Sequence, residues 1–359
     1  MRKSDTILTI PAPDDSPRWS RRGFLLTGAS LAGAAIAAPG LLEAARNSGT
    51  ERIRVAWIGS RASVRAPAPL LRETALGGAV SNSKVEIAAV CDADALRSAD
   101  LQKRVELWSG RKVAAFADHR RLLASKSVDA VVCAVPVDRR FEVSRDCINA
   151  GTHLYVTLPL ARNARELKEL VTLQEKHPRL KIQLDLELRS NREYEKAARL
   201  VREDRIVGDL LACECQRRDN ISMCCDIANW FTGERPERAR PVPGSPGAVI
   251  LEYPCGMELR FADAPTRFVG SAGEITPATG NIVYRSASFK SARVEKLEGE
   301  TLDPRRPLQS FFDTIIDDLS PFATIYHGRD ATLTALLAGE AAREGREVTW
   351  KELEEKRDS

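Results

Sequence analysis

The stretch that decides the fold is Arg-Val-Ala-Trp-Ile-Gly-Ser-Arg-Ala-Ser-Val-Arg-Ala-Pro-Ala-Pro-Leu-Leu-Arg, residues 54–72. Its first part predicts a short buried strand that turns sharply at Gly59, where a dinucleotide-binding fold cradles the pyrophosphate. Such a cradle uses Gly-x-Gly-x-x-Gly for the tight turn, for the approach of the phosphates and for helix packing. Here the second and third glycine positions are Arg61 and Val64, and two prolines follow. We therefore expect a nucleotide-binding fold with an incomplete phosphate cradle.

Composition places the chain among ordinary globular proteins. Its 359 residues are enough for two domains, and 43% are hydrophobic and 29% charged. A net charge of +4 without a dense basic stripe argues against nucleic acid as a partner. The four histidines stand singly and no Cys-x-x-Cys pair occurs, so we predict no metal site. Cys213-x-Cys215 and Cys224-Cys225 favour small core residues, with a disulfide or a metal site as alternatives.

The N-terminus has the pattern of a targeting signal. Arg21 and Arg22 precede a moderately hydrophobic stretch over residues 24–38, a pattern that resembles a twin-arginine export signal. This stretch is short for a helix that crosses about 30 Å of hydrocarbon, so we expect no stable membrane span after signal removal. An amphipathic N-terminal helix is the alternative. Residues 1–45 are therefore set aside as signal and linker, and we expect a bacterial periplasmic or cell-envelope location.

Strands and helices alternate through the next hundred residues. Apolar runs predict strands over 55–58, 85–91, 113–117, 127–136 and 153–157, with helices over 95–108, 119–124, 140–150 and 164–177. Strands that are buried on both faces and alternate with helices indicate a parallel, doubly wound α/β sheet. Asp92 ends the second strand, where an acidic side chain binds the adenosine ribose and disfavours a 2′-phosphate. A helix N-cap is the alternative role of Asp92.

Several segments in this order resemble the Gfo/Idh/MocA family of nicotinamide-dependent sugar and polyol oxidoreductases, especially its exported members. The similarity is carried by Arg54-Val-Ala-Trp-Ile-Gly, Ala89-Val-Cys-Asp-Ala-Asp, Phe116-Ala-Asp-His-Arg-Arg-Leu-Leu, Val128-Asp-Ala-Val-Val-Cys-Ala-Val-Pro and Ala150-Gly-Thr-His-Leu-Tyr-Val-Thr-Leu-Pro-Leu-Ala. The resemblance implies an N-terminal Rossmann-like domain over 50–160. It also implies a C-terminal α+β domain over 161–353, with a large open, mainly antiparallel sheet and final helices that pack back on the first domain.

The resemblance also implies ligands and partners. It implies NAD(P) as cofactor, with NAD favoured by Asp92, a sugar or polyol as the small molecule, and homo-oligomers formed through the C-terminal sheet. The expected cofactor contacts are Gly59, Ser60, Arg61, Asp92 and Pro136. Hydride transfer in the family uses a lysine in a Glu-Lys-Pro turn after the fifth strand, because the alcohol proton must leave with the hydride. Here the turn reads Thr-Leu-Pro, so the lysine position is Leu158.

The second domain is expected to begin with a strand over 181–187, followed by Arg189 at the substrate pocket. Asp219, Asp226 and Trp230 then fit the family's spacing, but the family's histidine position is Met223. Asp219 remains as the candidate acid or base, with a helix N-cap as its alternative role. Arg189 and Asp226 are the candidate substrate contacts.

Two proton-handling side chains are thus missing, and each such loss lowers a rate by ~10² to 10⁴. We predict a catalytically degenerate family member whose nucleotide binding is weak or absent. The alternative is an active NAD(P)-dependent sugar or polyol oxidoreductase, or a related glycoside-processing enzyme. In that case Arg61, Arg65 or Arg140 has taken over phosphate or substrate contacts, since arginine pairs with phosphate in a bidentate manner.

Overall fold

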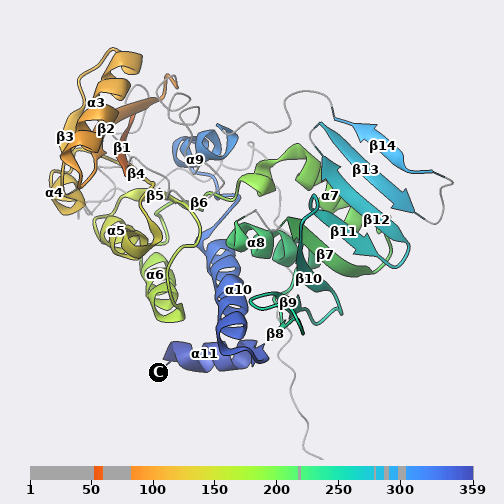
Figure 1. Cartoon of the computed structure of the whole chain (residues 1–359). Coiled ribbons are helices and arrows are strands. Elements are labelled where there is room, and N and C mark those ends of the chain that lie inside the picture. Colours follow the sequence, from red (N-terminus) through yellow and green to blue (C-terminus); the bar gives the residue numbers. More distant parts are fainter. Residues whose placement is uncertain are drawn as a thin grey trace, which may run out of the picture. The chain divides into compact units, whose positions relative to one another are not determined.

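The computed structural model describes residues 52–59, 82–216, 220–278, 280–286, 291–297 and 305–358. They belong to one compact unit that begins at Arg52 and contains two sheets (Figure 1). The predicted export signal, residues 1–45, lies outside the described residues, so it stays a prediction. Within the described residues, every helix is too short or too polar to span a membrane.

The first sheet has six strands in the order β3-β2-β1-β4-β5-β6. Its strands are β1 (Ile53–Ile58), β2 (Val85–Cys91), β3 (Ala114–Phe116), β4 (Ala130–Cys133), β5 (His153–Val156) and β6 (Ile182–Leu184). All neighbouring pairs are parallel. The strand order reverses between β1 and β4, which creates the switch point where open α/β sheets bind ligands. The predicted doubly wound parallel sheet is confirmed.

Helices connect these strands: α3 (Ala95–Ser109), α4 (His119–Ala124), α5 (Val137–Asn149) and α6 (Ala164–Lys176). The N-cap of α3 shows whether Asp92 caps this helix, a question that the sequence left open. Asp94 is the N-cap, and its side chain accepts hydrogen bonds from the N–H groups of Leu96 and Arg97. Asp92 therefore does not cap this helix, and the N-cap interpretation of Asp92 was wrong.

The sixth strand differs from the expectation. The segment around residues 181–187 was predicted to begin the second domain, beyond a boundary at residue 160. Instead β6 pairs with β5, with Ile182 opposite Leu154. A short strand that is buried on both faces has the same apolar sequence in either sheet, so its pattern did not reveal its neighbour.

The second sheet has nine strands in the order β14-β13-β12-β11-β7-β10-β9-β8-β15. They are β7 (Leu210–Gln216), β8 (Arg238–Pro241), β9 (Val249–Glu252), β10 (Glu258–Ala262), β11 (Arg267–Gly270), β12 (Gly273–Ala278), β13 (Asn281–Ser286), β14 (Arg293–Lys296) and β15 (Val348–Thr349). Among the described strands of this sheet, β7 and β10 pair in parallel and the other pairs are antiparallel. The predicted mainly antiparallel sheet is confirmed.

The remaining helical segments are η1 (Glu187–Ser190), α7 (Arg192–Arg202), α8 (Ile221–Thr232), α9 (Arg306–Ile316), α10 (Ile325–Glu344) and α11 (Trp350–Asp358). Two late helices contact the first sheet. Phe311 of α9 lies against Tyr155 of β5, with ring centroids 5.6 Å apart. Thr332 of α10 accepts a hydrogen bond from the N–H of Leu160 at 3.0 Å. These contacts hold the C-terminal helices against the strands of the first sheet.

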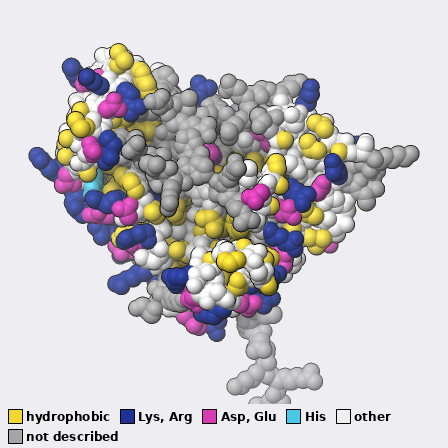
Figure 2. Space-filling view, in the orientation of Figure 1, with side chains coloured by type: hydrophobic (Ala, Val, Ile, Leu, Met, Phe, Trp, Pro, Cys, Tyr) yellow, Lys and Arg dark blue, Asp and Glu magenta, His cyan; other side chains and the backbone are white. Residues whose placement is uncertain are grey.

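Charges on the surface are mixed. Figure 2 shows basic and acidic side chains interspersed on the visible face rather than gathered into one basic field. On the nine-stranded sheet, Arg267 lies 2.8 Å from Glu214 and 3.2 Å from Glu274. Such pairs make the charge on this sheet locally mixed.

The contact between α10 and β6 leads to a stability prediction. A Cβ at Gly328 would lie 2.6 Å from Cγ of Leu184, a side chain that is fully buried. Overpacking of this kind costs about 1–3 kcal/mol, which exceeds the gain of up to about 1 kcal/mol from adding alanine to a helix. We therefore expect Gly328→Ala to lower the free energy of unfolding, measured by chemical denaturation.

The matched control is Gly339→Ala in the same helix, where no atom beyond the adjacent residues and the helix's own backbone lies within 4 Å of the added Cβ. This variant should be stabilised by about 0.5–1 kcal/mol. Equal effects of the two substitutions would contradict the proposed packing of α10 against β6.

Candidate functional site

The predicted site residues of the first domain follow strand ends. Gly59 follows β1, Asp92 follows β2, Pro136 follows β4 and Leu158 follows β5. Because neighbouring strands are parallel, these positions come to one edge of the sheet, where the switch point lies. Ser60 and Arg61 lie outside the described residues, so their phosphate contacts stay a prediction.

Gly59 is required by the chain itself. It has φ of 91°, in the left-handed region, and a Cβ there would lie 2.7 Å from the carbonyl oxygen of Ala134. Its N–H donates to the carbonyl of Cys91 at 2.8 Å. The turn after β1 is therefore packed tightly against the segment after β4. This close approach matches the first glycine of a nucleotide cradle, but it would be needed even without a nucleotide.

Asp92 is buried, with 8% of its surface exposed, and it is already hydrogen-bonded within the chain. Its Oδ1 accepts from the N–H of Asp94 at 2.9 Å. The same oxygen accepts from Nε and Nη2 of Arg97 at 3.3 and 3.2 Å. Arg97 was not among the residues predicted from the sequence to lie at this site. Its position in the first turn of α3, five residues after Asp92, was the available signal, since that turn returns over the strand end.

The turn after β5 begins with a buried apolar side chain. Leu158, at the family's lysine position, is 2% exposed and packs in the larger hydrophobic cluster. The peptide bond from Leu158 to Pro159 is cis. Arg140 of α5 donates from Nη1 to the carbonyl of Pro159 and from Nη2 to the carbonyl of Val135 at 2.9 Å. One guanidinium thus links the turns after β4 and β5.

Arg140 is only 4% exposed, and burial lowers its pKa to about 10. It remains charged at neutral pH, with two backbone carbonyls as its acceptors. The sequence left open that Arg140 had taken over phosphate or substrate contacts. The structure instead shows these donor groups committed to the protein backbone.

The two candidate substrate contacts of the second domain bind each other. Arg189 of η1 donates three hydrogen bonds to the carboxylate of Asp226 on α8, at 2.8–3.1 Å. Their side chains are 12% and 3% exposed. Burial raises the pKa of Asp226, and Arg189 opposes this rise. Trp230, one turn along α8, lies with its ring 5.3 Å from the Arg189 guanidinium carbon. The two residues are thus brought together as a buried, bidentate ion pair.

Two further positions of the second domain correspond to catalytic positions that the family resemblance implies. Met223, at the family's histidine position, is 7% exposed and belongs to the hydrophobic cluster. Asp219 lies outside the described residues, so its role as acid or base stays a prediction. The N-cap of α8 is Asn220, whose side chain accepts from the N–H of Ser222 at 2.9 Å. The alternative that Asp219 caps this helix was therefore wrong.

His327 of α10 is a histidine that the sequence left unassigned. Its Nδ1 accepts a hydrogen bond from the N–H of Thr324 at 3.1 Å, as part of the capping box of α10. Burial lowers the pKa of His327 to about 4, with a smaller contribution from the charge of Arg189. The imidazole is therefore neutral at physiological pH, and its known contact is structural.

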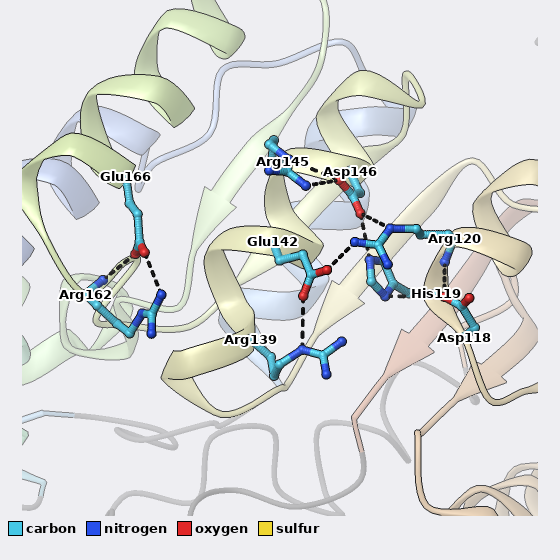
Figure 3. A network of polar contacts seen from close by, with 9 residues as sticks. All are labelled: Asp118, His119, Arg120, Arg139, Glu142, Arg145, Asp146, Arg162 and Glu166. Atoms are coloured by element: carbon cyan, nitrogen blue, oxygen red, sulfur yellow. Dashed lines mark hydrogen bonds and ion pairs between the residues drawn. The ribbon is translucent and has the colours of Figure 1, made fainter.

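A polar network on α4 and α5 has the residue types of a metal site (Figure 3). The ligand atoms of His119, Glu142 and Asp146 all lie within 4.8 Å of one another. His119 Nε2 is 2.9 Å from Asp146, and Arg120 reaches both Glu142 and Asp146. Because this guanidinium already balances both carboxylates, we interpret the network as a structural ion-pair cluster.

At the carboxyl edge of the first sheet, the residues present suit the adenosine end of a dinucleotide better than its nicotinamide end. At the adenosine end, Gly59 and Asp92 stand where a tight turn and a ribose acceptor are needed, and a carboxylate has acceptor sites for more than one donor. At the nicotinamide end, Leu158 offers neither a charge nor a proton. The described residues therefore fit the adenosine half of the cofactor and do not fit the family's hydride chemistry.

Comparisons with known proteins support the Rossmann-like fold of the first domain. Residues 53–184 match the model of GFO_IDH_MocA, an oxidoreductase family with an NAD-binding Rossmann fold. Two proteins named glycosyl hydrolase family 109 protein 2, from Shewanella sp. strains ANA-3 and MR-4, are each 36% identical over 93 residues. That stretch is 25% of this chain and spans a fifth of the relatives' length.

Solved structures share the whole architecture at low identity. Apo scyllo-inositol dehydrogenase from Lactobacillus casei matches with a TM-score of 0.65 and 18% identity, over 84% of this chain and 99% of that one. Aldose-aldose oxidoreductase from Caulobacter crescentus, complexed with glycerol, matches with 0.67 and 16%, over 83% and 100%. These likenesses show the fold. Residues 53–184 are thus similar to the NAD-binding Rossmann domain of the Gfo/Idh/MocA oxidoreductase family, and the chain shares the fold of these solved structures.

Proposed function

We propose that this protein keeps the nucleotide-binding scaffold of its family and has lost the family's hydride-transfer chemistry. The observation that carries the proposal is Leu158, which is 2% exposed at the lysine position. An apolar side chain in a sealed core cannot polarise a substrate oxygen or exchange its proton. The neighbouring turn is held by Arg140, so the missing charge is not restored from there.

The second domain supports the same proposal. Met223 places a buried thioether where the family has an imidazole. We propose that the pair Arg189–Asp226, with Trp230 beside it, forms the wall of a pocket for a sugar or polyol. Structures with this fold include a scyllo-inositol dehydrogenase bound to NAD(H) and scyllo-inositol. In this chain the pocket would bind such a molecule without oxidising it.

The cofactor, location and assembly are part of the proposal. We propose weak binding of a nicotinamide dinucleotide through Gly59 and Asp92, export by the twin-arginine route, and a role as a binding or assembly subunit. The nine-stranded sheet would form the homo-oligomer. Its alternating pairs, such as Arg267 with Glu214 and Glu274, offer both signs of charge to a second copy.

The second candidate is an active NAD(P)-dependent oxidoreductase or a glycoside-processing enzyme. The similarity to the glycosyl hydrolase family 109 proteins favours it, over 93 residues. An active enzyme needs a proton-handling group elsewhere, because Leu158 and Met223 cannot exchange a proton. Asp219 is the remaining candidate from the sequence, and turnover by the unmodified protein would establish this second function.

Titration with nucleotides tests the first half of the proposal. We expect NAD⁺ and NADH to bind the purified protein with a Kd of about 1 mM, because the second and third cradle glycines are absent. Isothermal calorimetry measures this affinity, and denaturation of the purified protein would release no stoichiometric nucleotide. Tight cofactor that survives purification would contradict the proposal.

Restoring both proton-handling groups tests the second half. The variant Leu158→Lys with Met223→His should gain NAD⁺-dependent oxidation of an inositol or aldose from a substrate panel, followed by NADH absorbance. Each single variant should fall short of the double variant by ~10² or more, since either missing group limits the rate. Leu158→Met with Met223→Leu is the apolar control and should stay inactive. Turnover by the unmodified protein at the level of the double variant would rule out a lost chemistry.

The ion pair gives a third test. Asp226→Asn leaves Arg189 buried without its counter-charge, which destabilises a protein by about 3–5 kcal/mol. The double variant Arg189→Met with Asp226→Leu should recover most of that stability in chemical denaturation, because no unpaired charge remains. If the pair binds a sugar or polyol, this folded double variant should lose the heat of inositol binding in calorimetry. Unchanged binding would show that the pair is structural only.

A further inference from the structure

We propose that Arg97 makes the ribose end of the nucleotide site tolerant of a 2′-phosphate, so that the protein binds NADP(H) about as well as NAD(H). This inference rests on the proposed function, because it requires that a nicotinamide dinucleotide bind at this edge. It departs from the sequence expectation, in which Asp92 alone favours NAD.

The geometry places a cation directly on the discriminating carboxylate. Nε and Nη2 of Arg97 both point at Oδ1 of Asp92, at 3.3 and 3.2 Å, and Nη1 lies 3.5 Å from Asp94. The Asp92 side chain is 8% exposed, whereas the Arg97 side chain is 46% exposed. The carboxylate is therefore held inside while the guanidinium reaches solvent, where a ligand can meet it.

The pair changes how the site treats a 2′-phosphate. A lone carboxylate at this position repels the added phosphate and keeps it out. An Asp92–Arg97 pair carries no net charge, and a guanidinium binds phosphate through two parallel hydrogen bonds. Arg97 is also always protonated at physiological pH. The repulsion that selects NAD is therefore offset by a donor in contact with the same carboxylate.

Neighbouring carboxylates set the limit of this effect. Asp94 carries its charge at the N-cap of α3, and Asp118 lies near enough to Cys91 to help raise the pKa of that thiol. Asp118 caps α4 through the N–H of Arg120. Among the described residues, two further negative charges thus lie near the Asp92–Arg97 pair. They oppose a strong preference for NADP(H), so tolerance of both nucleotides is the expected result.

Fluorescence titrations with NADH and NADPH test this inference without any reaction. For the unmodified protein, the two Kd values should agree within about threefold. Arg97→Gln should raise the ratio of the NADPH Kd to the NADH Kd by about ten- to a hundredfold, the worth of a charge-assisted hydrogen bond. Arg111→Gln is the matched control, because Arg111 follows the same helix, is 44% exposed and pairs with Glu86 instead. It should leave the ratio unchanged.

The possible results distinguish failure of the proposed role of Arg97 from failure of the proposed function. A ratio that Arg97→Gln does not move, or that Arg111→Gln moves equally, overturns the role of Arg97 alone. So does an unmodified protein that prefers NADH by more than about a hundredfold. Binding of neither nucleotide at millimolar concentration overturns the proposed nucleotide site and this inference together. Turnover with unchanged nucleotide tolerance overturns only the proposed loss of chemistry.

Discussion

One buried guanidinium holds the carboxyl edge of the parallel sheet together. Arg140 donates to the carbonyl oxygens that follow β4 and β5, and so joins the two turns at the carboxyl ends of these strands. A buried charge is tolerated only where hydrogen bonds compensate for its lost hydration. The two carbonyls provide that compensation for Nη1 and Nη2. The same two hydrogen bonds occupy Nη1 and Nη2 of Arg140, so these donors serve the backbone and not a ligand.

Two positions at which the sequence predicts a missing lysine and a missing histidine are part of the core. Leu158 and Met223 are both buried and both belong to the larger hydrophobic cluster. Replacing a charged or polar group by a well-packed apolar one commonly preserves or increases stability. An apolar side chain at each of these positions is therefore compatible with an intact fold. The turn at Gly59 persists because the backbone beside it leaves no room for a side chain.

The acidic candidates share a different pattern. Asp92 is bound by Arg97 and Asp226 by Arg189, so both of these predicted ligand contacts already have an arginine partner within the chain. The two pairs are not equivalent. Arg189 and Asp226 are both buried and hold each other by three hydrogen bonds, whereas Arg97 is about half exposed. The first pair is enclosed on both sides, whereas the guanidinium of the second pair reaches solvent.

The sequence by itself determined the alternation of strands and helices, the parallel sheet and the residue at each strand end. It could do so because burial on both faces and helical periodicity leave local patterns. The tertiary structure alone decided that β6 joins the first sheet, that Asp94 rather than Asp92 caps α3, and that Asp92 and Asp226 have arginine partners. Those facts depend on which side chains meet in space, and the charge of a residue does not say which opposite charge lies nearest to it.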